Sequence, residues 1–122
     1  FFGTLKNTPL LGLPGNPVST GVCAMVFLKK IIQKFLGQRI HDDIIHMKLN
    51  SDLNANDHRQ DYIRSKIIKR ANGDYLVEPF SKQDSSQISI FAKSDCFIIR
   101  KPNQQKLNKG SIVPVLKPNY NI

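Results

Sequence analysis

The segment 12–17, Gly-Leu-Pro-Gly-Asn-Pro, places two prolines and two glycines within six residues and constrains the fold more than any other part of the chain. Such a density of turn-forming residues predicts a tight loop. Asn16 followed by Pro17 is typical of a helix start, with asparagine as the N-cap and proline at the first helical position. Upstream, two short apolar runs flank the polar stretch 6–9 and indicate a hairpin or two strand ends.

A long helix is predicted from about Pro17 to Leu36, because apolar residues recur there at helical spacing and Gly37 is a natural stop. The apolar surface is wider than one stripe, so we expect the helix to be mostly buried. Its solvent-facing side is expected to consist of Lys29, Lys30, Gln33 and Lys34. Two short strands cannot cover a helix this apolar, which indicates part of an α/β unit.

From about residue 48 the sequence favours strands. The predicted strands are 62–68, 75–77, 95–100 and 111–116, with a short helical or turn segment at 85–92 and a polar loop at 102–110. Asn72-Gly73 is a hairpin signal, because this pair supplies the positive φ angles of a tight primed turn. The sequence therefore predicts a small all-β module over 48–122, joined to the helix by a linker over 38–47.

Charge is distributed unevenly in a chain whose formal net charge is +9. No acidic residue precedes Asp42, whereas the first 41 residues carry five lysines and arginines. A basic segment without acids suits an anionic ligand or partner, such as a phosphate-bearing small molecule, nucleic acid or an acidic protein. The alternative is a solvated face without a binding role.

Cysteine content and hydropathy bear on the compartment. Cys23 and Cys96 lie far apart and in no metal-ligand spacing, so we expect reduced cysteines used for packing in a cytoplasmic protein. No run of about 18 apolar residues occurs, so no membrane span and no membrane partner are predicted.

The proline-rich loop is also a candidate binding site. The first amides of a helix lack intrahelical partners and favour an anion. Gly15 allows a ligand to approach the backbone, and Pro14 and Pro17 stiffen the loop. Asn16 and Ser19 offer polar atoms. The alternative is an ordinary β-to-α turn whose prolines and glycines only shape the chain.

The string Gly-Leu-Pro-Gly-Asn-Pro-Val-Ser at 12–19 resembles the signature of the MoeA family, which includes the gephyrin E domain. Other segments resemble the same family in the same order, namely 2–5, 59–64, 72–80, 83–86, 91–95 and 109–115. The resemblance covers nearly the whole chain and identifies it as similar to the C-terminal part of a molybdopterin molybdenumtransferase. It implies an α/β fragment at 1–37, the end of a Mog-like molybdopterin-binding domain, and a β-barrel domain (domain IV) at 48–122.

The resemblance also implies an activity. Enzymes of this family take adenylyl-molybdopterin and molybdate, cleave the adenylate with a divalent cation such as Mg²⁺, release AMP and insert molybdenum at the dithiolene. By position, Pro14 and Pro17 would shape the molybdate pocket, and Arg64 and Ser85 would bind the oxyanion. A guanidinium offers forked donors to an oxyanion and a hydroxyl adds one more. A surface ion pair for Arg64 and a helix N-cap for Ser85 are the structural alternatives.

Some parts of the family's site are not expected within this sequence. The resemblance places the catalytic acidic residues, the lysines and the Mg²⁺ ligands upstream of Phe1, and it adds groups from the partner of a homodimer. We therefore expect the isolated chain to be inactive, and residues 1–37 to pack poorly and expose apolar surface. Asp84 departs from the family's glycine, and a carboxylate beside an oxyanion site is repulsive unless it points away.

Two other function classes compete with this interpretation. A pI of 9.8 and a small barrel also fit a nucleic-acid-binding module, but aromatic residues are not interleaved with the basic ones. An interaction scaffold is the other alternative, because gephyrin relatives also anchor membrane receptors. Because the basic residues are scattered and not interleaved with aromatic ones, no nucleic-acid partner is predicted. His41, His46 and His58 are not at metal-ligand spacing, so no metal site is predicted either.

Overall fold

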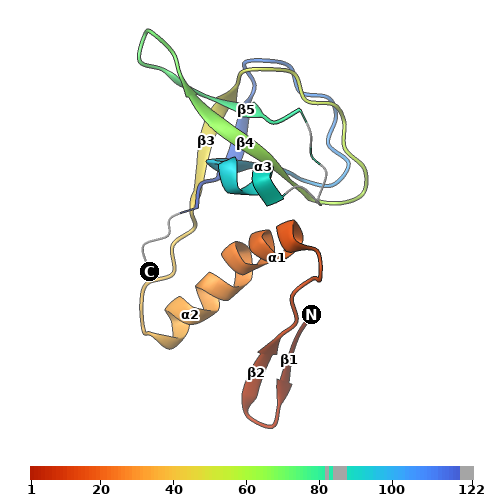
Figure 1. The fold of residues 1–122 in the computed structure, drawn as a ribbon, viewed down its shortest axis with the longest axis vertical. Helices are drawn as coiled ribbons and strands as arrows, with labels where there is room; N and C mark the ends of the chain where they lie inside the picture. Colours follow the sequence, from red (N-terminus) through yellow and green to blue (C-terminus); the bar gives the residue numbers. More distant parts are fainter. Residues whose placement is uncertain (82, 84–87, 119–122) are drawn as a thin grey trace.

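The computed structural model describes residues 1–81, 83 and 88–118. Figure 1 shows three parts in chain order: a hairpin at the N-terminus, a helical segment, and a β-barrel against which that segment lies. The elements are β1 (Phe2–Leu5), β2 (Thr8–Leu11), α1 (Pro17–Cys23), the π-helix η1 (Ala24–Leu28), α2 (Lys29–Phe35), β3 (Ile44–Leu49), β4 (Asp61–Lys69), β5 (Tyr75–Pro79), α3 (Ile88–Lys93), β6 (Cys96–Arg100) and β7 (Ile112–Leu116).

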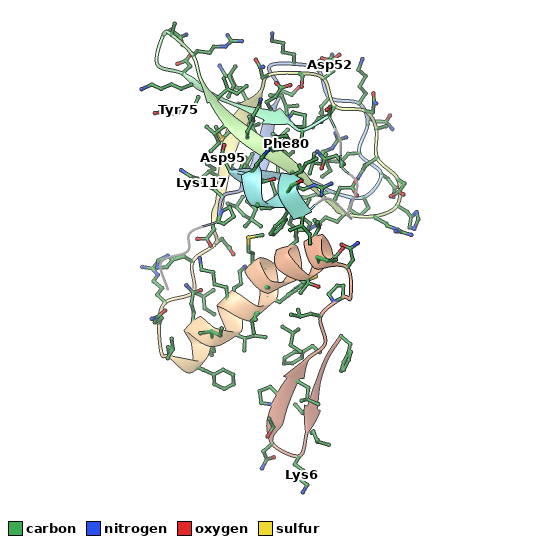
Figure 2. The ribbon with its side chains drawn as sticks, in the orientation of Figure 1. Lys6, Asp52, Tyr75, Phe80, Asp95 and Lys117 are labelled. Atoms are coloured by element: carbon green, nitrogen blue, oxygen red, sulfur yellow. The ribbon has the colours of Figure 1, made fainter. Side chains whose placement is uncertain are left out.

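The N-terminal strands and the helix start confirm the expected strand, loop and helix. β1 and β2 pair antiparallel around a tip that contains Lys6, which has a positive φ of 54° and lies at the end farthest from the barrel (Figure 2). Asn16 caps α1 as predicted, because its side-chain oxygen accepts hydrogen bonds from the backbone amides of Val18 and Ser19. Helical structure runs from Pro17 to Phe35, with a π-helical segment between its two α-helical parts.

The prediction for the faces of this helix was partly wrong. Gln33 is 6% exposed and Lys29 is half-buried, although both were assigned to the solvent-facing side. Phe35, assigned to the apolar surface, is 71% exposed. Positions 22, 26, 29 and 33 follow the three- and four-residue spacing that places side chains on one face of a helix. Polarity alone places Lys29 and Gln33 on the solvent-facing side, whereas their spacing places them on the face with Val22 and Val26. The long stem of Lys29 can be buried on that face while its ammonium group pairs with Asp43.

The all-β module is a closed barrel with the strand order β3-β5-β4-β6-β7. β3 pairs antiparallel with β7 and, over two residues, parallel with β5. The barrel core consists of Met47, Leu49, Leu53, Val77, Cys96, Ile98, Val113 and Val115. Every residue of β6 is buried, because one face of this strand lines the barrel interior and the other is covered from outside.

The barrel begins earlier than predicted. β3 starts at Ile44, inside the segment 38–47 that was expected to be a linker. The sequence did carry a signal for this strand, because Ile45, Met47 and Leu49 alternate with His46 and Lys48. In the structure Met47 and Leu49 are buried, whereas Ile44 and Ile45 are exposed. Residues 44–47 therefore belong to β3 and not to a linker.

The β4–β5 hairpin is present, but its turn is longer than the predicted primed turn. Among the connecting residues only Gly73 has a positive φ, at 90°. The Gly73 amide donates to the Arg70 carbonyl at 2.9 Å, and the Arg70 amide donates to the Asp74 carbonyl at 2.8 Å. This is a turn followed by a glycine in the left-handed region, an arrangement typical of loops longer than two residues. The Asn72 side chain instead accepts a hydrogen bond from the Asp74 amide.

The helix lies on the outside of β6 and joins the hairpin to the barrel. Val22 packs in a cluster with Phe97, Ile99 and Leu116 of the barrel, and Met25, Val26, Tyr62 and Phe91 pack against this cluster. Two ion pairs, Lys29 with Asp43 and Lys30 with Asp42, connect the helix to the segment before β3. These pairs offset part of the positive charge of the acid-free segment.

Residues 1–36 nevertheless expose many apolar side chains, as expected. The exposed ones include Phe1, Phe2, Leu5, Leu10, Leu13, Phe27, Phe35 and Leu36. None of the helices in the described part of the chain combines the length and apolar character needed to cross a bilayer.

Candidate functional site

A cleft of about 860 Å³ lies between the start of the helix and the barrel. Its helical wall comes from Val18, Ser19, Val22, Cys23, Val26 and Phe27, and its barrel wall comes from residues 59–64 and Gln83. We call it the helix–barrel cleft. It joins parts of the chain that are far apart in sequence.

The helical wall is held by side chains of the proline-rich loop. Asn16 Oδ1 accepts from the amides of Val18 and Ser19 at 3.1 and 3.2 Å. The Thr20 hydroxyl donates to the Asn16 carbonyl at 2.8 Å and contacts the Pro14 carbonyl as well. The loop is thus folded back on the first helical turn. Two of the helix-start amides that were expected to favour an anion are already bonded to Asn16.

The barrel wall is organised around Arg64, which is 2% exposed and occupies the point where β4 passes from one partner strand to the next. The Arg64 amide donates to Gln83 Oε1 at 2.9 Å, and Gln83 Nε2 donates back to the Arg64 carbonyl at 3.0 Å and to the Phe80 carbonyl at 2.8 Å. Arg64 Nε lies 3.5 Å from the same Gln83 oxygen. The side-chain amide of Gln83 therefore pairs with the backbone N–H and C=O of Arg64, as a neighbouring strand would, and fixes the position of that backbone.

Neighbouring anchors fix this part of β4. The Phe80 amide donates to the Arg64 carbonyl at 3.0 Å, and the Asp95 amide donates to the Ser65 carbonyl at 3.0 Å. The Asp95 carboxylate also accepts from the Ile67 amide at 3.0 Å. Figure 2 shows Phe80 and Asp95 close to β4 and α3. These bonds restrain the backbone that carries Arg64.

The cleft carries both charge signs. Arg59 and Arg64 line it together with Asp61. Asp61 stands opposite Arg100 in the β4–β6 register. Burial lowers the pKa of Arg100, and the nearby Asp61 carboxylate offsets this by raising it. The carboxylate of Asp61 therefore lies near a third cation, Arg100, besides the two arginines of the cleft.

Arg100 itself has a structural task at the end of β6. It is 1% exposed, and its guanidinium donates to the carbonyls of Asn54 and Gln105 at 3.1 and 2.8 Å. Its Nε donates to Gln104 Oε1 at 3.0 Å. These bonds hold the loops that close one end of the barrel, and they satisfy a cation that is costly to bury alone.

The structure brings some of the predicted site residues together and separates others. Ser19 and Arg64 line the same cleft, from opposite walls. Pro14 lines a neighbouring apolar hollow of about 450 Å³. Gly15 and Asn16 lie in the loop before α1, and Pro17 is the first residue of α1. None of the three is among the lining residues of either hollow. Ser85 and Asp84 lie outside the described residues.

Two residues of the cleft, Arg59 and Gln83, were not singled out from the sequence. Both belong to segments that resemble the MoeA family, 59–64 and 83–86, so the signal for them was present. What the sequence alone could not show is that Gln83 binds the backbone of Arg64.

A divalent cation would need several anionic or imidazole ligands at one place. Within the described ranges, no three His, Cys, Asp or Glu side chains gather closely enough to hold a metal ion. Of the described residues that line the helix–barrel cleft, Asp61 is the only one with a carboxylate. The described residues of the cleft therefore do not fit a Mg²⁺ site.

Comparisons with known proteins agree on one family. The family model described as the MoeA C-terminal region (domain IV) matches residues 46–117, more than half of the chain. A molybdopterin molybdenumtransferase of Haemophilus influenzae is 30% identical over 121 residues, which cover 98% of this chain and 30% of that protein. Molybdopterin molybdenumtransferase 1 of Mycobacterium tuberculosis is 27% identical, with 93% and 28% covered. The chain thus spans less than a third of the length of these relatives.

Solved structures show the same fold. A molybdopterin biosynthesis MoeA protein of Pyrococcus horikoshii superposes with a TM-score of 0.73 at 23% identity, covering 95% of this chain and 28% of that one. A molybdenum cofactor biosynthesis protein of Pyrococcus furiosus gives 0.67 at 18% identity, with 93% and 39% covered. The superpositions include the hairpin and helix as well as the barrel, because they extend over more of the chain than the barrel occupies.

Proposed function

Because the chain belongs to the family described as the MoeA C-terminal region (domain IV), we propose that it acts in molybdenum cofactor biosynthesis as the C-terminal part of a molybdopterin molybdenumtransferase. The reaction inserts molybdate into adenylyl-molybdopterin and releases AMP. The curated relatives that carry this activity in their names support the proposal.

The observation that carries the proposal is the meeting of Ser19 and Arg64 in one cleft. Both were selected from the sequence as oxyanion or phosphate ligands, and they come from the helix and the barrel. Molybdate is a tetrahedral oxyanion, so donors on two facing walls can bind different oxygens of it. A guanidinium supplies parallel donors in a rigid fork, and a hydroxyl adds a single donor.

Within the reaction, these residues bind and orient. Arg64 is held by Gln83 through its backbone, so its side chain projects from a restrained position. Arg59 adds a second positive charge to the same wall. The side chains of Val18, Val22, Val26 and Phe27 line the opposite wall and keep that side of the cleft apolar. An apolar wall strengthens the attraction between an oxyanion and the arginines.

Other groups of the reaction are assigned elsewhere. The Mg²⁺ that would assist cleavage of the adenylate, the acidic residues that hold it and the active-site lysines are proposed to lie outside this sequence, together with groups from the second subunit of a homodimer. The chain alone is therefore proposed to be inactive.

The test uses the whole gene product that contains these residues. Molybdate-dependent AMP release from adenylyl-molybdopterin is measured for the parent, Arg64→Ala, Arg64→Lys and Arg70→Ala. Loss of a charge-assisted contact predicts a roughly 10- to 100-fold lower kcat/KM for molybdate in Arg64→Ala. Arg64→Lys is expected to recover only part, because it keeps the charge and loses the fork. Arg70, an exposed arginine of the β4–β5 turn, is the matched control.

The outcomes separate the alternatives. Parent-like activity in a folded Arg64→Ala variant would sink the oxyanion role of Arg64 and keep the family assignment. A folded parent without AMP release would favour an interaction scaffold. Oligonucleotide binding that weakens steeply with salt would favour the nucleic-acid-binding alternative.

A further inference from the structure

A glycine in the middle of α1 makes an unusually close contact with the barrel side of the molecule. Gly21 faces the ring of Phe91 in α3, and a Cβ built on Gly21 would lie 2.4 Å from Phe91 Cζ and 2.9 Å from Cε1. Such distances are far below van der Waals contact. The close approach of the helix to this ring therefore requires a residue without a side chain.

Phe91 is partly buried, and a buried ring lies against it. Its ring packs against Phe97 with the centroids 5.5 Å apart and the planes tilted by 41°. Phe97 is 1% exposed and belongs to the cluster beneath the helix. A close-packed interior transmits a displacement instead of absorbing it. We therefore expect an added methyl group at Gly21 to displace both the Phe91 ring and α1, and to move α1 away from the barrel.

Helix propensity does not explain a glycine at this place. Glycine inside a helix destabilises it by roughly 1 kcal/mol relative to alanine. Gly21 stands one residue before Val22 and two after Ser19, and both of these neighbours line the helix–barrel cleft. A movement of this helical turn would therefore move one wall of the helix–barrel cleft.

We propose that Gly21 is a positioning residue that sets the distance between α1 and β4, so that the helix–barrel cleft fits a small tetrahedral oxyanion. This inference rests on the proposed function, since it assigns the oxyanion to that cleft. The reason is geometric: hydrogen bonds require donors about 2.7–3.2 Å from their acceptors. Ser19 and Arg64 can serve one small ion together only if their walls stay at one separation.

The consequence is specific to the oxyanion. Moving the helical wall by an ångström lengthens the bonds from one side of the cleft and leaves the barrel wall intact. A misplacement of this size can lower a rate that depends on binding geometry by up to about 100-fold. The effect should appear in the KM for molybdate, while kcat at saturating molybdate should change less.

The experiment measures KM for molybdate in AMP release by the whole gene product. Gly21→Ala is expected to raise this KM by roughly 10- to 100-fold. Gly3→Ala is the matched control, because nothing lies within 4 Å of a Cβ on Gly3. In a Phe91→Leu background the added methyl group has room, so Gly21→Ala should then change KM by less than about threefold. Melting temperature and methyl NOEs between Val22 and Leu116 report folding and helix position.

Three outcomes would overturn the inference. A Gly21→Ala variant with a lower melting temperature and an unchanged KM would show that the contact serves packing only, and would overturn the inference. An equally large rise in KM in the Phe91→Leu background would overturn it too, and this comparison remains possible if Gly21→Ala alone does not fold. Absence of molybdate-dependent AMP release in the folded parent would refute the proposed function itself, and the inference with it.

Discussion

The barrel and the segment before it bury their apolar side chains to different extents. The barrel closes on itself around a core in which Val77, Ile98 and Val115 are fully buried. The hairpin and helix of residues 1–35 have only one buried face, the one that touches β6, and Phe1 is 85% exposed. The candidate site residues therefore lie at the contact between the closed barrel and the helix. Because the helix buries its apolar face only by packing on the barrel, the cleft between them depends on that packing.

The largest expected effect tests whether the two regions are energetically separate. Val77→Ala and Val22→Ala remove the same two methyl groups, one from the barrel core and one from the helix contact. Val77→Ala should lower the free energy of unfolding of the barrel by roughly 2 to 3 kcal/mol, because the whole side chain is buried. Val22→Ala should leave barrel unfolding nearly unchanged and accelerate amide exchange in α1 and α2.

Urea unfolding and hydrogen exchange measure the two quantities on the same samples. If Val22→Ala destabilises the barrel as much as Val77→Ala does, the helix and barrel form one cooperative unit and are not energetically separate.

The second effect concerns the two cysteines, one from each region. Cys96 is fully buried in the barrel, and burial raises the pKa of its thiol from an ordinary value of 9.0 to about 12, with a smaller contribution from Asp95. The unfolded thiol loses its proton first as pH rises above 9, so the folded state binds more protons there. Stability from this group is therefore complete below pH 9 and falls between pH 9 and 12.

We expect a decrease of about 1.4 kcal/mol in the free energy of unfolding between pH 8 and 10, in excess of that in Cys96→Ala. Cys23→Ala is the matched control for the removal of a thiol. Identical slopes for Cys96→Ala and the parent would show that the thiol contributes nothing to the pH dependence.

The smallest effect addresses the ionic link between the regions. Asp43→Asn removes the carboxylate that pairs with Lys29 while keeping its shape. The pair is mostly shielded from solvent on both sides, but such links contribute modestly, so destabilisation of helix docking by up to about 1 kcal/mol is expected. High salt should reduce the difference between Asp43→Asn and the parent. A difference that persists unchanged in 1 M salt, an ionic strength that screens beyond about 3 Å, would indicate lost hydrogen bonding and not charge.

Local signals predicted much of the architecture. The strand, loop and helix of the N-terminal segment follow from residues 12–17, and β4, β6 and β7 follow from β-prone runs. β3 was missed although Ile45, Met47 and Leu49 alternate with His46 and Lys48, because the change to β-prone sequence was placed at about residue 48. Its pairing with β7 joins segments that are distant in sequence, and that neighbour could not be predicted locally.

Part of the cleft lining was selected from the sequence. Arg64 was selected by the family resemblance and Ser19 by its polar atom beside the proline-rich loop, and both line the helix–barrel cleft. That they bind an oxyanion stays a prediction. The burial of Arg64, Gln33 and Arg100 could not be predicted, because a polar side chain is buried only where distant partners or packing permit it. The same holds for the role of Gly21, since the ring that requires it belongs to α3.

The pairing of β3 with β7 has a consequence for how the chain acquires its structure. Ile44 stands opposite Leu116, so the first strand of the barrel has the last one as its neighbour. The hairpins β1–β2 and β4–β5 need only nearby residues and can form early. Closure of the barrel must wait until β7 has been synthesised, and it bears the entropic cost of joining ends that are far apart in sequence. Completion of the cleft, whose helix lies on β6 and β7, is therefore a late event in the folding of this chain.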